Sequence, residues 1–310
     1  MDPHELDVVR RAYAKQVVAA AGIDDPRVER AFAAVRREDF LGPGPWQIVR
    51  RGGGCVATSS ADPVYLYTDH LVGIVPERDL NNGQPSLHAM LIAREAPQPG
   101  EHTVHVGAGV GYYTALLADL VGAQGFVTAI EFDPTLAARA AGNFSGVANV
   151  AVVQGAVVDF DPADVIYVNA GATRPAQTWL DRLKDGGRLI LPLTTNQGFR
   201  ANDPQNIRRR DAVFRIERRG EEFAARWISP VAIFPCEGGG ANPHPKQHLP
   251  LPFKLSAGAR LRGFMRRFVN NDVKNNDVKT IGRMFASYSI QTQQVSLIAA
   301  INAHSSGWFM

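Results

Sequence analysis

Apolar positions along this chain follow two spacings, one typical of helices and one typical of buried strands. Leu6–Ala21 has helical spacing, and Asp25-Pro26 supplies an N-cap and a first-turn proline for a second helix. Strand-like runs separated by helical runs follow at 104–106, 126–130, 150–153, 164–168 and 188–191. This alternation predicts a doubly wound α/β fold with a mostly parallel sheet, whose ligands bind at the carboxyl ends of the strands.

A glycine-rich turn follows the first of these strands. Gly107, Gly109 and Gly111 stand at every second position, and an apolar helical run begins at Tyr112. Glycine permits positive φ and leaves no Cβ where a ligand presses against the main chain. The helix that follows points its first N–H groups at the same place. The turn is therefore a candidate binding site for a carboxylate or phosphate group.

An acid follows the second strand of the alternation. Phe126–Ile130 ends at Glu131, about 20 residues after the turn, where such folds place the acid that binds ribose hydroxyls. The G-x-G-x-G spacing is the form of this turn in S-adenosylmethionine-dependent methyltransferases, whereas the nicotinamide fingerprint is G-x-G-x-x-G. A nicotinamide-dependent oxidoreductase is therefore the less favoured interpretation. A glycine turn that binds no ligand remains an alternative interpretation.

A polar turn leads into an apolar helix at residues 79–91. Asn82 and Gln84 offer amide groups, Gly83 permits close approach, and Pro85 suits the first turn of a helix. This segment either covers a ligand held on the glycine turn or is an ordinary capped helix start.

Several stretches in the same order resemble protein-L-isoaspartate O-methyltransferases: 21–25, 35–41, 84–85, 104–113 and 186–192. The resemblance extends from the first helix to about Leu193. It implies a Rossmann-like, doubly wound sheet of the class I methyltransferase type, with an N-terminal helical cap and a C-terminal extension. It also implies S-adenosyl-L-methionine as cofactor and methyl transfer to a carboxylate oxygen of a peptide or protein.

The resemblance also assigns roles to individual positions. Asn82, Gln84 and His88 become the candidate catalytic residues. The candidate cofactor-binding residues are Val106, Gly107, Ala108, Gly109, Gly111, Tyr112, Glu131, Phe132, Gly155, Ala156 and Asn169. No metal is implied.

Two departures from the family pattern concern the cofactor. His105 stands where the family usually has an acid, and Gly155-Ala156-Val157 stands where it usually has Gly-Asp-Gly. The acid that contacts adenine is therefore missing. Asp159 or Asp161 could replace it by a small shift, although both also read as loop acids.

A third departure concerns the methyl acceptor, because the active-site serine of the family is Gly83 here. The loss of a hydroxyl predicts an altered acceptor and poor isoaspartate repair. A second hypothesis is a non-catalytic protein that kept the fold and binds S-adenosylmethionine or another partner.

Composition adds limits to these readings. The 310 residues are 45% hydrophobic, carry a net charge of +3 and include two cysteines. No long apolar run and no secretion signal is recognisable, so we expect a cytoplasmic protein that binds neither membranes nor nucleic acid. The expected division is a helical cap with the active-site loop (1–95), a core with a closing hairpin (96–236) and a basic extension (237–310). The sequence does not indicate an oligomeric state.

The last part of the chain is locally cationic. Lys246–Arg283 contains nine lysines and arginines against two aspartates. This region either attracts an acidic peptide or protein substrate or is a solvated face. Cys236, His244 and His248 offer metal-ligand chemistry, but no second cysteine pair accompanies them and a loop is the better interpretation.

Overall fold

The computed structural model describes residues 2–50, 54–156, 158–194, 211–233 and 253–255. These residues belong to one compact unit, within which the predicted boundary between residues 95 and 96 falls. Most of the predicted basic extension, together with Cys236, His244 and His248, lies outside the described residues.

The described elements follow the predicted alternation from residue 85 to residue 193. The helices are α1 (Pro3–Ala21), α2 (Pro26–Ala34), α3 (Glu38–Leu41), α4 (Pro85–Glu95), α5 (Tyr112–Val121), α6 (Pro134–Asn143) and α7 (Gln177–Arg182), with 3-10 helices η1 (Pro63–Leu66) and η2 (Pro76–Arg78). The strands are β1 (Gln47–Val49), β2 (Cys55–Ala57), β3 (Gly73–Val75), β4 (Leu80–Asn81), β5 (His102–Val106), β6 (Phe126–Glu131), β7 (Val150–Gln154), β8 (Ala163–Val168), β9 (Leu183–Leu193), β10 (Ala212–Arg219), β11 (Glu222–Pro230) and β12 (Phe253–Leu255).

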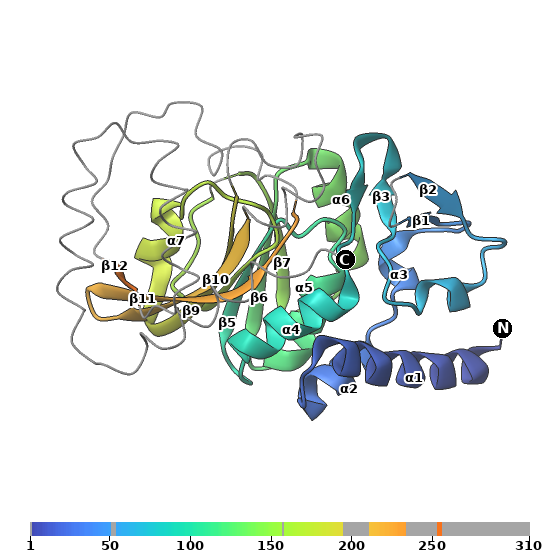
Figure 1. Ribbon diagram of the computed structural model, residues 1–310, viewed down its shortest axis with the longest axis horizontal. Coiled ribbons are helices and arrows are strands. Elements are labelled where there is room, and N and C mark those ends of the chain that lie inside the picture. The colour runs from blue at the N-terminus through green and yellow to red at the C-terminus, as the bar shows by residue number, and fades with distance from the viewer. Residues whose placement is uncertain (1, 51–53, 157, 195–210, 234–252, 256–310) are drawn as a thin grey trace, which may run out of the picture. The chain divides into compact units, whose positions relative to one another are not determined.

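One eight-stranded sheet has the order β12-β11-β10-β9-β8-β5-β6-β7 (Figure 1). The strands from β9 to β7 are mutually parallel, and β10 runs antiparallel to both β9 and β11. The predicted parallel sheet and closing hairpin are therefore confirmed. Because β5 pairs with β6 on one side and β8 on the other, the carboxyl ends of these three strands meet at one edge.

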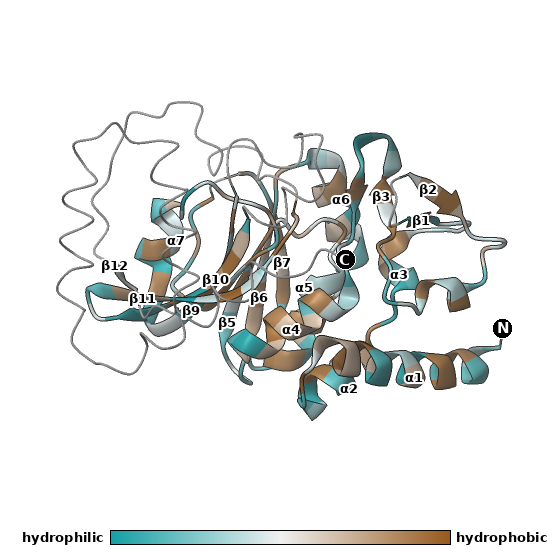
Figure 2. Ribbon diagram, in the orientation of Figure 1, coloured by the Kyte–Doolittle hydropathy of each residue, from teal (hydrophilic) through white to brown (hydrophobic). Residues whose placement is uncertain are grey.

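N-cap residues fix where the helices begin, and apolar faces pack them on the sheet and on one another. Asp25 accepts the N–H groups of residues 27 and 28 to start α2, as predicted. Asp133 also stands before a proline, a sequence that predicts the start of a helix, and it accepts the N–H groups of residues 135 and 136 to start α6. Helices α4 and α5 pack on the sheet, and α1 and α2 pack on α4 and α5 (Figure 1). Figure 2 shows hydrophobic colour concentrated on α4 and in the sheet, whereas α1 alternates between hydrophobic and hydrophilic residues.

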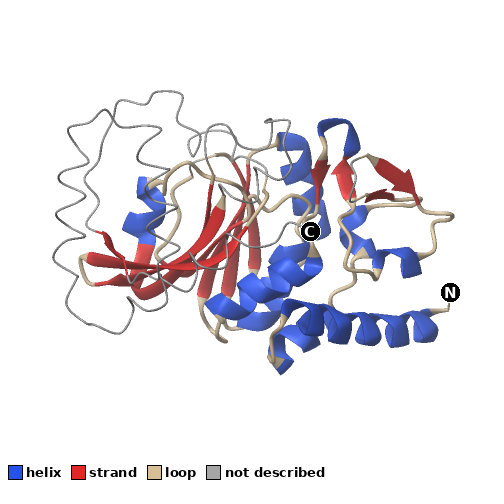
Figure 3. Cartoon of the chain, viewed as in Figure 1, coloured by secondary structure: helices blue, strands red, loops and turns tan. Residues whose placement is uncertain are grey.

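The segment between α2 and α4 is more ordered than the sequence predicts. The arginine-, glycine- and proline-rich sequence of residues 36–54 predicts an irregular connection with a solvated basic patch, but these residues include α3 and β1, and β1 pairs with β2. Figure 3 shows the β1–β2 pair and the β3–β4 pair as small sheets outside the main one. Strands of two or three residues leave too short a pattern to recognise in the sequence. Among the described helices, none is long and apolar enough to cross a bilayer.

Arg37, expected in a solvated basic patch, is instead fully buried. Its guanidinium donates to three carbonyl groups of the loop at 66–70. It also lies 5.8 Å from the ring centre of Tyr13 and 5.5 Å from that of Tyr112. Carbonyl groups and aromatic faces thus surround a cation that no described carboxylate pairs with, and the loop is fixed to the cap helices.

Glu95 is a buried acid in the last turn of α4. Arg215 Nε lies 3.4 Å from Glu95 Oε1, yet neither carboxylate oxygen accepts a hydrogen bond from a described residue. Burial raises the pKa of Glu95 to about 8, which Glu101 and Glu217 reinforce and which Arg215 and Arg188 oppose. Burial outweighs the nearby cations because the carboxylate loses its water without gaining donors.

This pKa predicts a pH-dependent effect of Glu95→Gln on stability. The folded-state pKa lies above the ordinary value of 4.5, so the stability linked to this proton is complete below pH 4.5 and is lost as the pH rises through about 8. Glu95→Gln should match the parent near the lower pH and exceed it by up to about 5 kcal/mol near pH 9. Thermal unfolding of both proteins across this range tests the point, and a difference independent of pH would contradict it.

Candidate functional site

The glycine turn joins β5 to α5. All three predicted glycines have positive φ, at 76° for Gly107, 57° for Gly109 and 95° for Gly111. A Cβ at Gly111 would lie 2.5 Å from Phe144 Cε2, so internal packing requires this glycine. A Cβ at Gly109 would have Ile74 Cδ1 at 3.7 Å as its nearest neighbour. Gly109 therefore leaves open the place where a ligand can approach the backbone.

Glu131 holds this turn from the carboxyl end of β6. Its Oε2 accepts the Gly109 N–H at 2.6 Å, and its Oε1 accepts the Asp133 N–H at 2.9 Å. Burial raises the pKa of Glu131, and the two N–H donors oppose that rise. Because a carboxylate has about four lone-pair sites, each oxygen keeps one for a ribose hydroxyl.

The ends of neighbouring strands meet at the same place, as predicted. The Gly155 N–H donates to the Glu131 carbonyl at 2.8 Å, and the Asn169 N–H donates to the Val106 carbonyl at 2.8 Å. Phe132 follows Glu131 directly and is 42% exposed. An exposed aromatic ring beside a buried acid suits a ligand with a flat ring next to a sugar.

The other predicted cofactor residues contribute differently. Ala108 donates its N–H to the β6 backbone at 3.1 Å, and Ala156 is half-buried beyond the end of β7. The Tyr112 ring is buried among the cap helices, with ring centres of Phe32 at 6.3 Å and Phe40 at 6.0 Å. Only the backbone of Tyr112 is therefore available to a cofactor.

Asn82, one of the three candidate catalytic residues, is buried between the β3 and β4 segments. Asn82 is 5% exposed, and its Oδ1 accepts the Val72 N–H at 2.9 Å. Its own N–H donates to the Val72 carbonyl at 2.9 Å. Asn82, which directly follows β4, is thus bonded to Val72, which directly precedes β3, and its side-chain oxygen accepts one of the two hydrogen bonds.

The start of α4 is capped by a residue from the loop that Arg37 holds. Asp69 accepts the Ser86 N–H and the Ser86 hydroxyl, both at 2.7 Å, and the Gln84 side-chain N–H at 2.9 Å. Gln84 itself is exposed and makes no side-chain cap. Sequence reasoning missed Asp69 because it lies in an irregular segment, 17 residues from Ser86, where no spacing links the two.

His88 is a neutral, tightly held histidine behind this helix start. Its ring stacks on Tyr113 with centres 3.7 Å apart, and its Nδ1 lies 2.7 Å from the Tyr167 hydroxyl. Burial, reinforced by His105 and Arg37, lowers the pKa of His88 to about 3. His88 therefore carries no charge near neutral pH.

Tyr113 links the two halves of the candidate site. It lies in the first turn of α5, directly after the glycine turn, and its hydroxyl donates to the Gly83 carbonyl at 3.2 Å. Gly83 and His88 are therefore both held against the start of α5. The structure thus brings the segment at 83–88 next to the predicted cofactor turn.

Two polar residues named where the sequence departs from the family pattern, Asp159 and His105, bond to other residues of the fold. Asp159 is exposed and pairs with Arg182, whose Nε lies 2.7 Å from its Oδ1. His105 is fully buried, and its Nδ1 lies 2.8 Å from the Thr114 hydroxyl oxygen. Burial lowers the pKa of His105 to about 3, so it is a neutral core residue.

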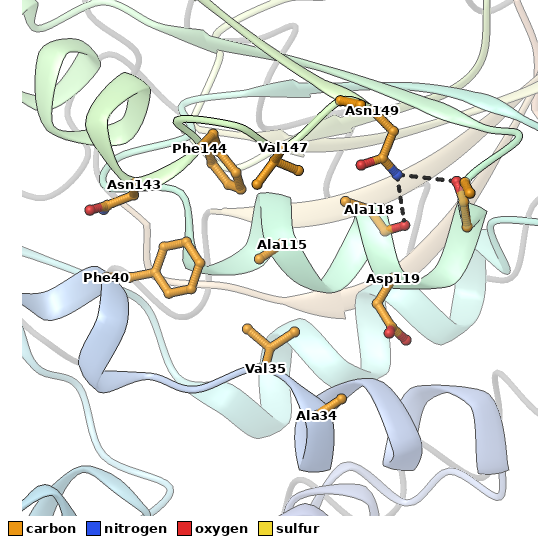
Figure 4. Close-up of a pocket in the computed structure, with 13 residues that line it drawn as sticks. Ala34, Val35, Phe40, Ala115, Ala118, Asp119, Asn143, Phe144, Val147 and Asn149 are labelled. Atoms are coloured by element: carbon orange, nitrogen blue, oxygen red, sulfur yellow. Dashed lines mark hydrogen bonds between the residues drawn. The ribbon is translucent and has the colours of Figure 1, made fainter.

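A separate pocket lies between the end of α2, α5 and the turn after α6 (Figure 4). Its lining is mostly small and apolar, and at its edge Asn149 donates to the carbonyls of Ala118 and Gly122. None of the predicted cofactor or acceptor residues lines it. Across the described ranges, no three histidine, cysteine, aspartate or glutamate side chains gather in a way that could hold a metal ion.

A parallel sheet centred on β5, a G-x-G-x-G turn at the end of that strand and an acid that holds the turn from β6 define a class I methyltransferase. A family model described as protein-L-isoaspartate(D-aspartate) O-methyltransferase matches residues 55–220. The chain belongs to the protein-L-isoaspartate O-methyltransferase family, which consists of S-adenosylmethionine-dependent methyltransferases.

Similar proteins agree with this assignment. A protein-L-isoaspartate O-methyltransferase of Rhodopseudomonas palustris is 29% identical over 74% of this chain and 94% of its own length. One of Thermotoga maritima is also 29% identical, over 56% of this chain, and the match spans only about half (51%) of that relative. A solved protein-L-isoaspartate O-methyltransferase shares the fold, with a TM-score of 0.60 and 24% identity, over 75% of this chain and 67% of its own. A second, from Plasmodium falciparum in complex with S-adenosyl-L-homocysteine, has a TM-score of 0.56 and 17% identity, over 74% and 98%.

Proposed function

We propose that this protein transfers the methyl group of S-adenosyl-L-methionine to the free carboxylate of an isoaspartyl residue in a peptide or protein. The observation that supports the proposal is that one glycine turn is held by Glu131 through the Gly109 N–H and lies next to the segment at 83–88 through the bond from Tyr113 to the Gly83 carbonyl. We assign the nucleoside to the Glu131 end of this turn and the methyl acceptor to the wall formed by residues 83–88. Family membership supports the substrate class.

The residues fit the cofactor. Glu131 offers free lone pairs to ribose hydroxyls, Gly109 admits the ligand to the backbone, and Phe132 offers an exposed ring to adenine. The bound cofactor supplies a methyl group that is electrophilic because it is carried by a sulfonium. Of the two acids that could replace the missing adenine contact, Asp159 is paired with Arg182, and Asp161 is exposed.

The acceptor side asks for alignment more than for proton transfer. A carboxylate is already ionised at neutral pH, so the site needs no general base, and correct positioning supplies much of the rate. His88, Tyr113 and Tyr167 are buried and keep water from this wall. Because burial lowers its pKa to about 3, His88 is too weak a base to serve as a general base near neutral pH.

An altered acceptor, expected from Gly83, finds no support among the relatives compared, all of which are named as isoaspartate methyltransferases. We therefore keep the isoaspartyl carboxylate as the proposed acceptor. The missing hydroxyl at position 83 predicts slow methylation of this carboxylate, and the experiment below measures that rate.

The test is transfer of labelled methyl from S-adenosylmethionine to an isoaspartyl peptide, with the aspartyl peptide of the same sequence as control. We expect base-labile label on the isoaspartyl peptide alone, because a methyl ester is cleaved by base. Binding of S-adenosylhomocysteine without any transfer would instead favour the non-catalytic alternative.

A further inference from the structure

The His88 imidazole occupies the space that a side chain at position 83 would need. Gly83 has φ of 76°, and a Cβ at this position would lie 2.2 Å from His88 Nε2 and 2.9 Å from its Cδ2. The ring cannot easily retreat, because it stacks on Tyr113 and is held by Tyr167. A side chain at position 83 would therefore cover Nε2 or displace the ring, and glycine leaves the nitrogen uncovered.

Tyr167 decides which nitrogen of His88 carries the proton. Tyr167 is fully buried, and burial raises its pKa well above the usual value, so the phenol keeps its proton. The hydrogen-bond partner of its hydroxyl within the described part of the chain is His88 Nδ1, at 2.7 Å. A buried O–H must donate, so Nδ1 accepts and the proton of the neutral imidazole resides on Nε2.

The Nε2–H donor therefore points toward Gly83, and it makes no hydrogen bond with any described residue. Nε2 of His88 is not among the fully buried side-chain atoms that lack a hydrogen-bond partner, so the acceptor of a ligand can reach this donor. Its surroundings place it on the acceptor side of the site, because Tyr113 holds both Gly83 and His88 against the start of α5.

We propose that His88 Nε2–H binds one oxygen of the acceptor carboxylate beside Gly83, which makes His88 a specificity-determining residue and Tyr167 a positioning residue. The inference rests on the proposed function. A fixed, uncharged donor selects a carboxylate oxygen without taking a proton from it. Because the charge on the carboxylate falls as its oxygen accepts the methyl group, this hydrogen bond is stronger before reaction and acts mainly on acceptor affinity.

Substitutions of both residues test the proposal. His88→Leu should raise the KM for the isoaspartyl peptide by at least about tenfold and change kcat and affinity for S-adenosylhomocysteine by less than about threefold. His88→Gln restores an N–H donor and should recover part of the affinity. Tyr167→Phe keeps the ring but releases the tautomer, so the KM should rise to an intermediate value. An unchanged KM in His88→Leu, in a protein that methylates the peptide, would overturn this inference and leave the proposed function standing.

His102→Gln is the control, because His102 lies at the start of β5 and its ring nitrogens bond to the Pro162 carbonyl and the Thr128 hydroxyl, away from Tyr167 and His88. We expect its KM for the peptide to be that of the parent.

Nitrogen-15 NMR of the imidazole groups gives a readout that does not depend on turnover. We expect the Nε2–H tautomer for His88 in the parent protein. Its Nε2 signal should move when isoaspartyl peptide is added with S-adenosylhomocysteine, while the His102 signals stay in place. An Nδ1–H tautomer, or a bound peptide that leaves the His88 signals unchanged, would overturn the inference. A peptide that neither binds nor is methylated would overturn the proposed function together with it.

Discussion

Glu131→Ala is expected to weaken binding of S-adenosylhomocysteine by about tenfold to a hundredfold. A hydrogen bond to a charged acceptor contributes about 1.5–3 kcal/mol, and the variant removes the acceptor for the ribose hydroxyls. It also frees the Gly109 and Asp133 N–H groups that the carboxylate now holds. The turn and the ribose contact are therefore lost together, and titration calorimetry measures the result.

Asp159→Ala is the matched control for this loss. Asp159 is an acid near the end of the next strand, and its exposed pairing with Arg182 gives it no part in the glycine turn. Its removal should leave affinity within about twofold. Gly109→Val should abolish binding, because the open place at Gly109 would be filled. If Glu131→Ala and Gly109→Val both bind like the parent, the cofactor site has been misplaced.

Arg37→Met is expected to cause the largest loss of stability, about 3 kcal/mol or more. Methionine fills much of the volume but leaves three carbonyl groups of the 66–70 loop without their donor. For a chain of 310 residues, the loss corresponds to a Tm lower by about 5 °C or more. Thermal unfolding measures this loss of stability. The variant should also bind the peptide more weakly, with or without cofactor, because the same loop holds Asp69 at the start of α4.

Arg36→Met is the control at the neighbouring position. Arg36 is about half-exposed (54%), and from the surface it pairs with the mostly buried Glu38 and the exposed Asp39. An exposed pair contributes little, so the change should be within about 1 kcal/mol. Equal stability of the two methionine variants would show that the buried guanidinium is not needed to hold the loop.

The part of the site formed by adjacent residues was predictable. Glycine spacing, the strand that ends at Glu131 and the caps at Asp25 and Asp133 depend on backbone preferences within a few residues. The structure confirms each of these positions. The short strands β1 and β2 were not predictable, because the segment at 36–57 has no sustained period.

The other part of the site arises from residues that are distant along the chain. Asp69 caps α4 across 17 residues, and Tyr167 lies 79 residues from the histidine whose tautomer it sets. Arg37 reads as a surface residue in a basic stretch and becomes buried only because α1, α5 and the 66–70 loop close around it.

By itself, the sequence determined the class of fold, the glycine turn and the acid at the end of β6, because these follow from local periodicity and from what each backbone position permits. Only the tertiary structure decided that Asn82 bonds across the β3–β4 pair and that the Tyr112 ring packs among the N-terminal helices. It also decided that Gly83 leaves the Nε2 atom of His88 uncovered. Such roles depend on burial and on partners from other segments. Those partners exist only once the chain has folded, so no local pattern of residues records them.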